Sequence, residues 1–420
     1  MIQVMKFGGA SVKNPDAIRN VARILSHFKE DAILLVVSAM DKTTNHLEML
    51  AHLARDQKEA EAWAQFDKIK SFHLEHVNDL FEGDLQALVR EKILNYFQQI
   101  ERIVRGILLL KEFPPSTYDR IVSHGELLST TLVAAYLEKE NHDCQWIDAR
   151  DYIKTDASYQ RGEVIWSLTE ENIQQKVAPA MRAGKFIVTQ GFIGSTTEGK
   201  TTTLGREGSD YTGSIFAYCL GAKNLTVWKD VIGILNADPR LRDETQKHEQ
   251  LSYEEAVEMT FYGASVIHPK TIKPLFSKEI PLKVKCFADI KEPGTVIGAQ
   301  GDDQVITSYI IKKRQAYLHI KPKDFSFMEE RLMQQIFDHV YKSGVKVNLV
   351  QNSAISLMLC VDDRENTVNE LEALLLDTFE VETERELKLF TVMNYQAADL
   401  AEAHGARMVQ QYDKNLSYVK

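Results

Sequence analysis

The sequence predicts an α/β protein with a largely parallel central sheet, followed by a smaller α+β domain. Short apolar runs typical of buried strands alternate with helical stretches through most of the chain. Glycine, proline and acidic residues then gather at 292–303, the clearest break in composition. The segments after this break follow a βαββα order, which is typical of a ferredoxin-like fold. We therefore expect a first domain at 1–298 and a second at 306–420.

Size and composition limit the possible partners and location. A chain of 420 residues with 44% hydrophobic residues can bury more than one core. Its net charge of -10 argues against nucleic acid and against an anionic membrane as partner. No apolar run approaches the roughly 20 residues of a membrane helix. The four cysteines are far apart and include no CxxC pair, which favours a reducing, cytoplasmic location and argues against structural zinc.

The N-terminal segment predicts a parallel βαβ unit. A buried strand at 2–7 ends in a glycine turn, a helix at 14–28 carries an apolar stripe, and a second strand follows at 32–38. Ligands of such units bind beyond the carboxyl ends of the strands. The residues expected at this edge are Gly8, Gly9, Ser11 and Ser38.

A helical insertion is expected at about 45–113, because this stretch is charged, rich in helix formers and nearly free of glycine and proline. His73 and His76 within it have the spacing of a metal pair, but no third ligand is in view, so we interpret them as part of a helix face and predict no protein metal site. Further strands are expected at 144–147, 186–190, 224–228 and 282–287, and further helices at 170–183 and 254–262.

The C-terminal segment predicts the smaller domain element by element. Strands are expected at 316–320, 345–350, 355–361 and 387–393, and helices at 325–343 and 365–378. The remaining 394–420 segment has room for a helix near 397–404 and a short strand.

The stretch 201–212 is the strongest candidate for chemistry. A threonine run, two glycines, Arg206 and Asp210 precede an apolar helical segment at 211–220. Backbone amides at a helix N-terminus, a fixed cation and a carboxylate would therefore converge, which is an arrangement suited to an anion. An ordinary surface ion pair between Arg206 and Asp210 is the alternative.

The segment Gly194–Thr201 matches the phosphate-binding P-loop pattern letter for letter. A true P-loop needs a helix that starts at its Lys-Thr end, so that the helix N-terminus faces the phosphates. Here a β-branched run broken by Gly205 follows Lys200, which favours a β-hairpin. We therefore expect a hairpin at this position.

The chain carries four spaced motifs, which are Lys6-Phe-Gly-Gly-Ala-Ser-Val12, Ser123-His-Gly-Glu126, Gly205-Arg-Glu-Gly-Ser-Asp210 and Trp228-Lys-Asp-Val-Ile-Gly-Ile-Leu-Asn-Ala-Asp-Pro-Arg240. Together they resemble the aspartate kinases of the amino-acid kinase family. The resemblance implies the three-layer amino-acid kinase fold, with a C-terminal domain similar to ACT regulatory domains and a tail too short for a full second ACT repeat. It also implies ATP-dependent phosphorylation of the L-aspartate β-carboxylate to 4-phospho-L-aspartate with Mg²⁺, the first step towards lysine, threonine and methionine.

The resemblance also implies roles for individual residues. Lys6 would stabilise the transferring phosphoryl group, and Asp210 would orient Lys6 and the nucleophile. Arg206 would hold the substrate α-carboxylate through two parallel hydrogen bonds, and Glu126 would hold the α-ammonium. Further substrate contacts would come from Ser38, Thr44 and Ser209. The nucleotide would contact Lys6, Gly8, Gly9, Ser11, Lys229, Asp230, Asp238 and Arg240.

The sequence departs from the family pattern at three positions of the expected site. Ala10 replaces a usual threonine, Glu207 a usual glycine, and Ser265 a frequent phosphate-binding lysine. Our hypothesis is that Lys229 supplies the charge lost at position 265. Glu207 adds a negative charge beside Arg206.

Regulation and assembly are expected from the resemblance. Related ACT domains bind lysine or threonine at a dimer interface, in a region that corresponds here to Gln351, Asn352 and Ser353. We expect a homodimer built partly through residues 306–420. Two alternatives stay open: another amino-acid kinase acting on glutamate, acetylglutamate or a nucleotide, or a catalytically weak protein that senses amino acids.

Overall fold

The computed structural model describes residues 1–28, 31–184, 186–242, 244–264, 267–302 and 305–420. They form two compact units, which are described separately. The first contains residues 1–234, 249–253 and 267–301, and the second contains the described residues of 235–248, 254–266 and 302–420. The chain thus changes unit several times between residues 234 and 267, a detail that composition alone did not indicate.

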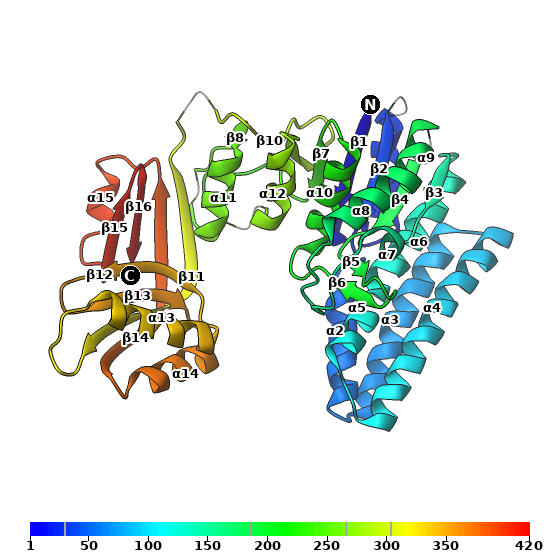
Figure 1. The fold of residues 1–420 in the computed structure, drawn as a ribbon. Helices are drawn as coiled ribbons and strands as arrows, with labels where there is room; N and C mark the ends of the chain where they lie inside the picture. Colours follow the sequence, from blue (N-terminus) through cyan, green and yellow to red (C-terminus); the bar gives the residue numbers. More distant parts are fainter. Residues whose placement is uncertain (29–30, 185, 243, 265–266, 303–304) are drawn as a thin grey trace. The chain divides into compact units, whose positions relative to one another are not determined.

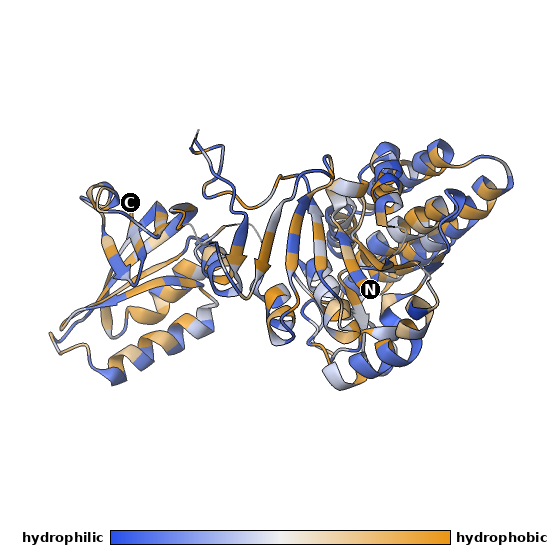
Figure 2. Cartoon of the chain, turned by 90° about the horizontal axis from the view of Figure 1, so that it is seen from above, coloured by the Kyte–Doolittle hydropathy of each residue, from blue (hydrophilic) through white to orange (hydrophobic). Residues whose placement is uncertain are grey.

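The first unit is built on an eight-stranded sheet with the order β3-β4-β2-β1-β7-β9-β10-β8. Neighbouring strands are parallel except β9 and β10, so the predicted mainly parallel α/β sheet is confirmed. Figure 2 shows hydrophobic residues along the central strands. The strands are β1 (Ile2–Phe7), β2 (Ala32–Val37), β3 (Cys144–Trp146), β4 (Phe186–Gln190), β7 (Leu225–Lys229), β8 (Gln250–Ser252), β9 (Leu282–Cys286) and β10 (Thr295–Gly298).

Helices cover both faces of this sheet (Figure 1). α6 contacts β2, β3 and β4 and packs on α1, while α10 contacts β1, β2 and β7 and packs on α12. These helices are α1 (Pro15–Leu25), α6 (His124–Lys139), α7 (Ala149–Tyr152), α8 (Trp166–Asn172), α9 (Ala178–Arg182), α10 (Gly208–Leu220) and α12 (Pro269–Ser277). Short helical turns are η1 (Gly9–Val12), η2 (Ser26–Phe28) and the π-helical η3 (Ile173–Val177).

The predicted helical insertion is present as three long helices. α2 (Thr43–Arg55), α3 (Glu59–Leu80) and α4 (Gly83–Leu110) extend beyond the sheet in Figure 1. Their apolar stripes, with Leu47, Phe66 and Phe97 among the buried residues, continue the core that lies under α1 and α6. α5 (Pro115–Val122) then leads the chain into α6, with Pro115 at its first position as expected for this residue.

Two expected elements of the first unit differ from the observed ones. The helix expected to start at residue 211 starts at Gly208, which places Asp210 in its first turn. The expected break at 292–303 contains β10, which pairs with β8 and β9. Two buried residues, Thr295 and Ile297, hold this short strand in the sheet, a signal too short to recognise beside the glycines around it.

The second unit contains a six-stranded antiparallel sheet with the order β12-β13-β11-β14-β16-β15. Its βαββαβ order confirms the predicted ferredoxin-like pattern. The elements are β11 (Ser308–Pro322), α13 (Glu330–Ser343), β12 (Val347–Asn352), β13 (Leu357–Asp362), α14 (Glu365–Leu375), β14 (Phe379–Met393), α15 (Asp399–Glu402), β15 (Met408–Tyr412) and β16 (Asn415–Val419). α11 (Tyr253–Phe261) lies almost entirely in this unit.

The strands of this second sheet also differ from expectation. β11 and β14 are 15 residues each, much longer than the predicted strands 316–320 and 387–393. The added first half of β14 alternates exposed glutamates with half-buried residues, a pattern of a strand with one face in solvent. The tail forms two strands rather than one, and β16 pairs with β14. No helix within the described residues is long and apolar enough to cross a membrane.

Candidate active site

A buried ion pair joins the end of β1 to the start of α10. Lys6 lies on a strand that pairs with β2 on one side and β7 on the other, and its Nζ lies 2.5 Å from Oδ1 of Asp210. Both residues are less than 10% exposed. Burial alone would raise the pKa of Asp210, but the charges of Lys6 and then Lys229 outweigh it and hold this pKa below its ordinary value. Asp210 is therefore an ionised carboxylate at a helix N-terminus.

Lys229 brings a second ammonium group to the same carboxylate. It is the last residue of β7, and its Nζ lies 3.9 Å from Oδ2 of Asp210. Lys6 and Lys229 therefore come from neighbouring parallel strands and reach Asp210 from two sides. Two cations against one carboxylate leave a net positive charge, which suits a further anion.

The glycine turn after β1 lets the backbone approach the next loop. A Cβ added to Gly9 would lie 2.8 Å from the carbonyl oxygen of Ala39 and 2.9 Å from that of Asp41, so only glycine fits there. A Cβ on Gly8 would lie 3.6 Å from Nζ of Lys6, so this turn borders the ion pair. Ser11 is buried, and its hydroxyl donates to the carbonyl oxygen of Trp228 at 3.3 Å. The structure thus gives the Ser11 hydroxyl a partner in β7, while its predicted contact with nucleotide stays a prediction.

Glu126 is a fully buried carboxyl group in the first turn of α6. The backbone N–H of Ala39 donates to its Oε1 at 3.3 Å, and its Oε2 has no hydrogen-bond partner among the described residues. Burial raises the pKa of Glu126 to about 8, and the charge of Lys6 partly opposes this. The hydroxyl of Ser129 donates to the carbonyl oxygen of Ser38 at 2.7 Å, which fixes α6 against the end of β2. An unpartnered buried oxygen of this kind is suited to a cationic donor from a ligand.

The N-terminus of α10 packs closely on the end of β4. A Cβ on Gly191 would lie 2.4 Å from Cβ of Ser209, and the backbone N–H of Phe192 donates to the hydroxyl of Thr212 at 2.9 Å. Ser209 is therefore held near the carboxyl edge of the sheet, next to Asp210. Thr44, in the first turn of α2, is half-buried, and its predicted substrate contact remains a prediction.

Arg206 does not form the alternative ion pair with Asp210. Its side chain is exposed and has no acidic partner among the described residues, whereas Asp210 is paired with the two lysines. Glu207 follows in a left-handed conformation with φ of 55°. Glycine adopts this conformation freely, while other residues bear a cost of roughly 1 kcal/mol. This gives a backbone reason for the glycine usual at this position; the advantage of glutamate stays unexplained.

The hairpin expected in place of a P-loop is confirmed. β5 (Ile193–Ser195) and β6 (Thr201–Thr203) pair antiparallel, and the backbone N–H of Thr196 donates to the carbonyl oxygen of Lys200 at 2.9 Å. The chain leaves Lys200 as a strand, so no helix N-terminus faces a phosphate at this position.

A buried aspartate that the sequence analysis missed anchors this hairpin. The carboxylate of Asp119 accepts hydrogen bonds from the backbone N–H groups of Gln160 and Thr203 and from the Thr203 hydroxyl, at 2.9 to 3.1 Å. The hairpin leads directly to Arg206 through Gly205. The sequence feature that could have identified Asp119 is the presence of an acidic residue on an otherwise apolar helix face, shortly before Ser123.

The remaining predicted residues that the structure describes lie just after β7 or in the second unit. Asp230 is exposed just after β7. Asp238 and Arg240 form an exposed bidentate pair in the second unit, with Nε–Oδ1 and Nη2–Oδ2 distances of 2.9 and 2.7 Å. Ser265 lies outside the described residues. Gln351, Asn352 and Ser353 are exposed at the β12–β13 turn, where the Ser353 hydroxyl contacts that of Ser356. Their roles in binding stay predictions.

The histidine pair of the insertion makes local contacts. Nδ1 of His73 and Nδ1 of His76 donate to the helix carbonyl oxygens of Ile69 and Phe72. Among the described residues, no group of three or more histidine, cysteine or acidic side chains is arranged to hold a metal ion.

The buried carboxyl group makes the stability of the protein depend on pH. Because the pKa of Glu126 is near 8 in the folded protein and ordinary in the unfolded chain, the unfolded state ionises it first. Its contribution to stability is therefore present below about pH 4.5 and is lost as pH rises through about 8. We expect Glu126→Gln to gain stability relative to the unsubstituted protein between pH 5 and 8 by at least about 1 kcal/mol.

Urea unfolding at several pH values measures this difference. Glu138→Gln, at an exposed position of the same helix, is the matched control and should follow the unsubstituted protein at every pH. Parallel pH profiles for Glu126→Gln and the unsubstituted protein would show that Glu126 is not a buried neutral acid.

Comparison with known proteins identifies the family. Residues 1–286 match the amino acid kinase family. The chain is 31% identical to aspartokinase 1, chloroplastic, of Arabidopsis thaliana, over 91% of this chain and 67% of that protein. It is 30% identical to lysine-sensitive aspartokinase 3 of Escherichia coli, over 87% of this chain and 79% of that protein.

A solved structure agrees with these sequence relatives. The crystal structure of E. coli aspartokinase III in complex with aspartate and ADP superposes with a TM-score of 0.84 at 28% identity, covering 100% of this chain and 96% of that one. The aligned region thus includes both units of the fold. The chain belongs to the amino acid kinase family and, within it, to the aspartokinases.

Proposed function

We propose that this site transfers the γ-phosphoryl group of ATP to the β-carboxylate of L-aspartate, giving 4-phospho-L-aspartate and ADP. The observation that carries the proposal is the buried Asp210 carboxylate held between Lys6 and Lys229. The buried carboxyl group of Glu126, whose Oε2 has no hydrogen-bond partner among the described residues, also lies within the field of Lys6. The related E. coli structure contains both aspartate and ADP, which supports this pair of ligands. The product would supply the synthesis of lysine, threonine and methionine.

The chemistry requires positioning and charge neutralisation more than proton transfer. An oxygen of the aspartate β-carboxylate attacks the γ-phosphorus, and the bond from that phosphorus to the bridging oxygen of ADP breaks. A carboxylate is already a nucleophile, so no general base is needed. Lys6 would neutralise charge on the transferring group, while Asp210 would hold Lys6 in place and orient the nucleophile. Gly8, Gly9 and Ser11 would border the phosphates.

The amino-acid end of the substrate would be held by charge complementarity. Glu126 would bind the α-ammonium group, because a cation beside its free Oε2 stabilises the ionised form and lowers its raised pKa. Arg206 is exposed and uncompensated, and would hold the α-carboxylate in two parallel hydrogen bonds. Ser38, Thr44 and Ser209 would complete the substrate contacts.

Mg²⁺ would be held mainly by the oxygens of ATP. Asp210 is already engaged by two lysines, and the described residues provide no cluster of carboxylates at this edge. This arrangement is common for Mg²⁺ bound with nucleotide phosphates, where the ion keeps several water ligands. Bound there, the ion would add positive charge to the phosphates that Lys6 and Lys229 face.

The second unit would carry regulation and assembly. We propose that residues 306–420 form an ACT-like regulatory domain, that lysine or threonine binds near Gln351, Asn352 and Ser353, and that two copies pair through this region. The E. coli relative that is named lysine-sensitive supports an amino-acid effector. We also propose a cytoplasmic enzyme with no nucleic-acid partner, in keeping with the net charge of -10.

A hydroxamate assay with ATP, Mg²⁺ and each candidate acid tests the proposed reaction. We expect product with aspartate, little with glutamate or acetylglutamate, and a loss of about 100-fold or more for Lys6→Ala, the usual effect of removing one group that stabilises the transition state. Activity with glutamate alone would overturn the choice of substrate. ATP left unconsumed with every acid, together with lysine binding, would instead support the sensor alternative.

Lys229 provides a separate test of the nucleotide contact. Because a charge-assisted hydrogen bond is worth about 1.5–3 kcal/mol, we expect Lys229→Ala to raise the KM for ATP by roughly tenfold or more. Lys223→Ala, at an exposed position before the same strand, is the matched control and should leave this KM unchanged. An unchanged KM for ATP in Lys229→Ala would rule out the hypothesis that Lys229 replaces the usual lysine.

A further inference from the structure

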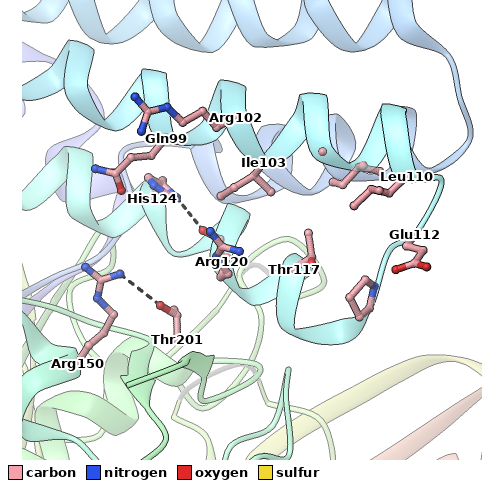
Figure 3. Close-up of a pocket in the computed structure, with 13 residues that line it drawn as sticks. Gln99, Arg102, Ile103, Leu110, Glu112, Thr117, Arg120, His124, Arg150 and Thr201 are labelled. Carbon is pink, nitrogen blue, oxygen red and sulfur yellow. Dashed lines mark hydrogen bonds between the residues drawn. The ribbon is translucent and has the colours of Figure 1, made fainter. Parts of the chain in front are cut away.

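A pocket lies between the helical insertion and the β5–β6 hairpin of the first unit. Its volume is about 540 Å³, within the range of small-molecule sites. Figure 3 shows side chains from α4 along one wall, from α5 and α6 along another, and Arg150 and Thr201 near one end. The lining residues are Gln99, Arg102, Ile103, Gly106, Ile107, Leu110, Glu112, Pro114, Thr117, Arg120, His124, Arg150 and Thr201.

One part of this pocket is strongly basic. Arg102, Arg120 and Arg150 line it, against the single carboxylate of Glu112. Arg150 is already held, because its guanidinium donates to both oxygens of Asp148 and to the Thr201 hydroxyl. Among the described residues, the guanidinium groups of Arg102 and Arg120 have no acidic partner. A pocket lined by three arginines, two of which have no acidic partner among the described residues, is suited to an anion.

The buried side chain of His124 lies in the wall of the pocket, within the electric field of these arginines. Nδ1 of His124 donates to the carbonyl oxygen of Arg120 at 2.7 Å, so its neutral ring is fixed in one orientation. Burial lowers the pKa of His124 to about 4, and the charges of Arg150 and Arg120 act in the same direction. His124 therefore adds no further positive charge near neutral pH, and the arginines alone supply the charge of the wall.

The other part of the pocket is lined by apolar side chains and a glycine. Ile103, Ile107 and Leu110 line it beside Gly106. Gly106 lies inside the 28-residue helix α4, where glycine is less favourable than alanine. A Cβ at this position would meet no atom within 4 Å, so close packing does not explain the glycine. Residues that are locally unfavourable and have no packing reason are expected at functional sites, and Gly106 leaves this wall of the pocket without a side chain.

We propose that this pocket binds a small amphipathic organic anion. A carboxylate or phosphate group would lie between Arg102, Arg120 and Arg150, and an apolar body would lie along Ile103, Gly106 and Ile107. The site is distinct from the Asp210 cluster, because His124 and Glu126 are two positions apart on α6 and so point to nearly opposite sides of the helix. The proposal does not depend on which reaction the enzyme performs.

Calorimetric titration of the full-length protein with phenyl phosphate and with phenylacetate tests the site. The two probes share an aromatic body and differ in their anionic group, so they distinguish the preferred head group. We expect at least one of them to bind with a Kd of millimolar or tighter, and the double variant Arg102→Gln/Arg120→Gln to weaken that binding at least tenfold. Both arginines are exposed, so the fold should be kept.

Arg105→Gln is the matched control for charge. Arg105 lies on the same helix, pairs with Glu101 at 2.7 Å and does not line the pocket, so its variant should bind the probe within twofold of the unsubstituted protein. Gly106→Leu is the control for shape. This variant should raise the Kd of the aromatic probe at least tenfold and leave the binding of inorganic phosphate unchanged. Its melting temperature should be at least equal to that of the unsubstituted protein.

Three outcomes would overturn the proposal. The first is the absence of binding by either probe at about 10 millimolar, roughly ten times the weakest Kd that we expect. The second is equal weakening by Arg105→Gln and by the double variant, which would indicate a diffuse charge effect. The third is unchanged binding of the aromatic probe in Gly106→Leu.

Discussion

The buried contact of Lys6 with Asp210 is the interaction on which the rest of the site depends. Neither charge could be buried alone without a large cost in free energy, so each requires the other. The pair joins the centre of the parallel sheet to the first turn of α10, and Lys229 adds a second cation from the next strand. The resulting surplus of positive charge lies at the carboxyl edge of the strands, where ligands of α/β sheets bind.

Close backbone packing keeps this pair in position. Glycines at 9, 125 and 191 each stand where a Cβ would come within 3 Å of a neighbouring segment, so the loops after β1, β2 and β4 and the helices α6 and α10 converge tightly. Asp119 adds a buried hydrogen-bonded anchor for the hairpin that leads to Arg206. Glu126, whose Oε1 accepts a hydrogen bond from the backbone N–H of Ala39, adds a carboxyl group of raised pKa from helix α6. The site is therefore assembled from several segments that are distant in sequence.

Local patterns in the sequence predicted much of this arrangement. The alternation of strands and helices predicted the parallel sheet, and the β-branched run after Lys200 predicted a hairpin in place of a P-loop. The meeting of Lys6 with Asp210 followed from the family motifs, because no local property of either segment specifies a contact across 204 residues of chain. Strand β10 and the anchoring role of Asp119 were missed, since each depends on partners brought near only by the tertiary fold. The left-handed backbone conformation of Glu207 could not be predicted either, because glutamate has no preference for this conformation.

The coupling between Lys6 and Asp210 in phosphoryl transfer is the most direct test of this account. Single-turnover rates with ATP and aspartate would be measured for Lys6→Met, Asp210→Asn and the double variant, with circular dichroism to confirm the fold. If the two residues act as a unit, the double variant should be about as slow as the slower single variant, because residues of this kind are strongly non-additive. If the fold-losses in rate of the two single variants instead multiply in the double variant, as for two independent sites, the result would contradict the account.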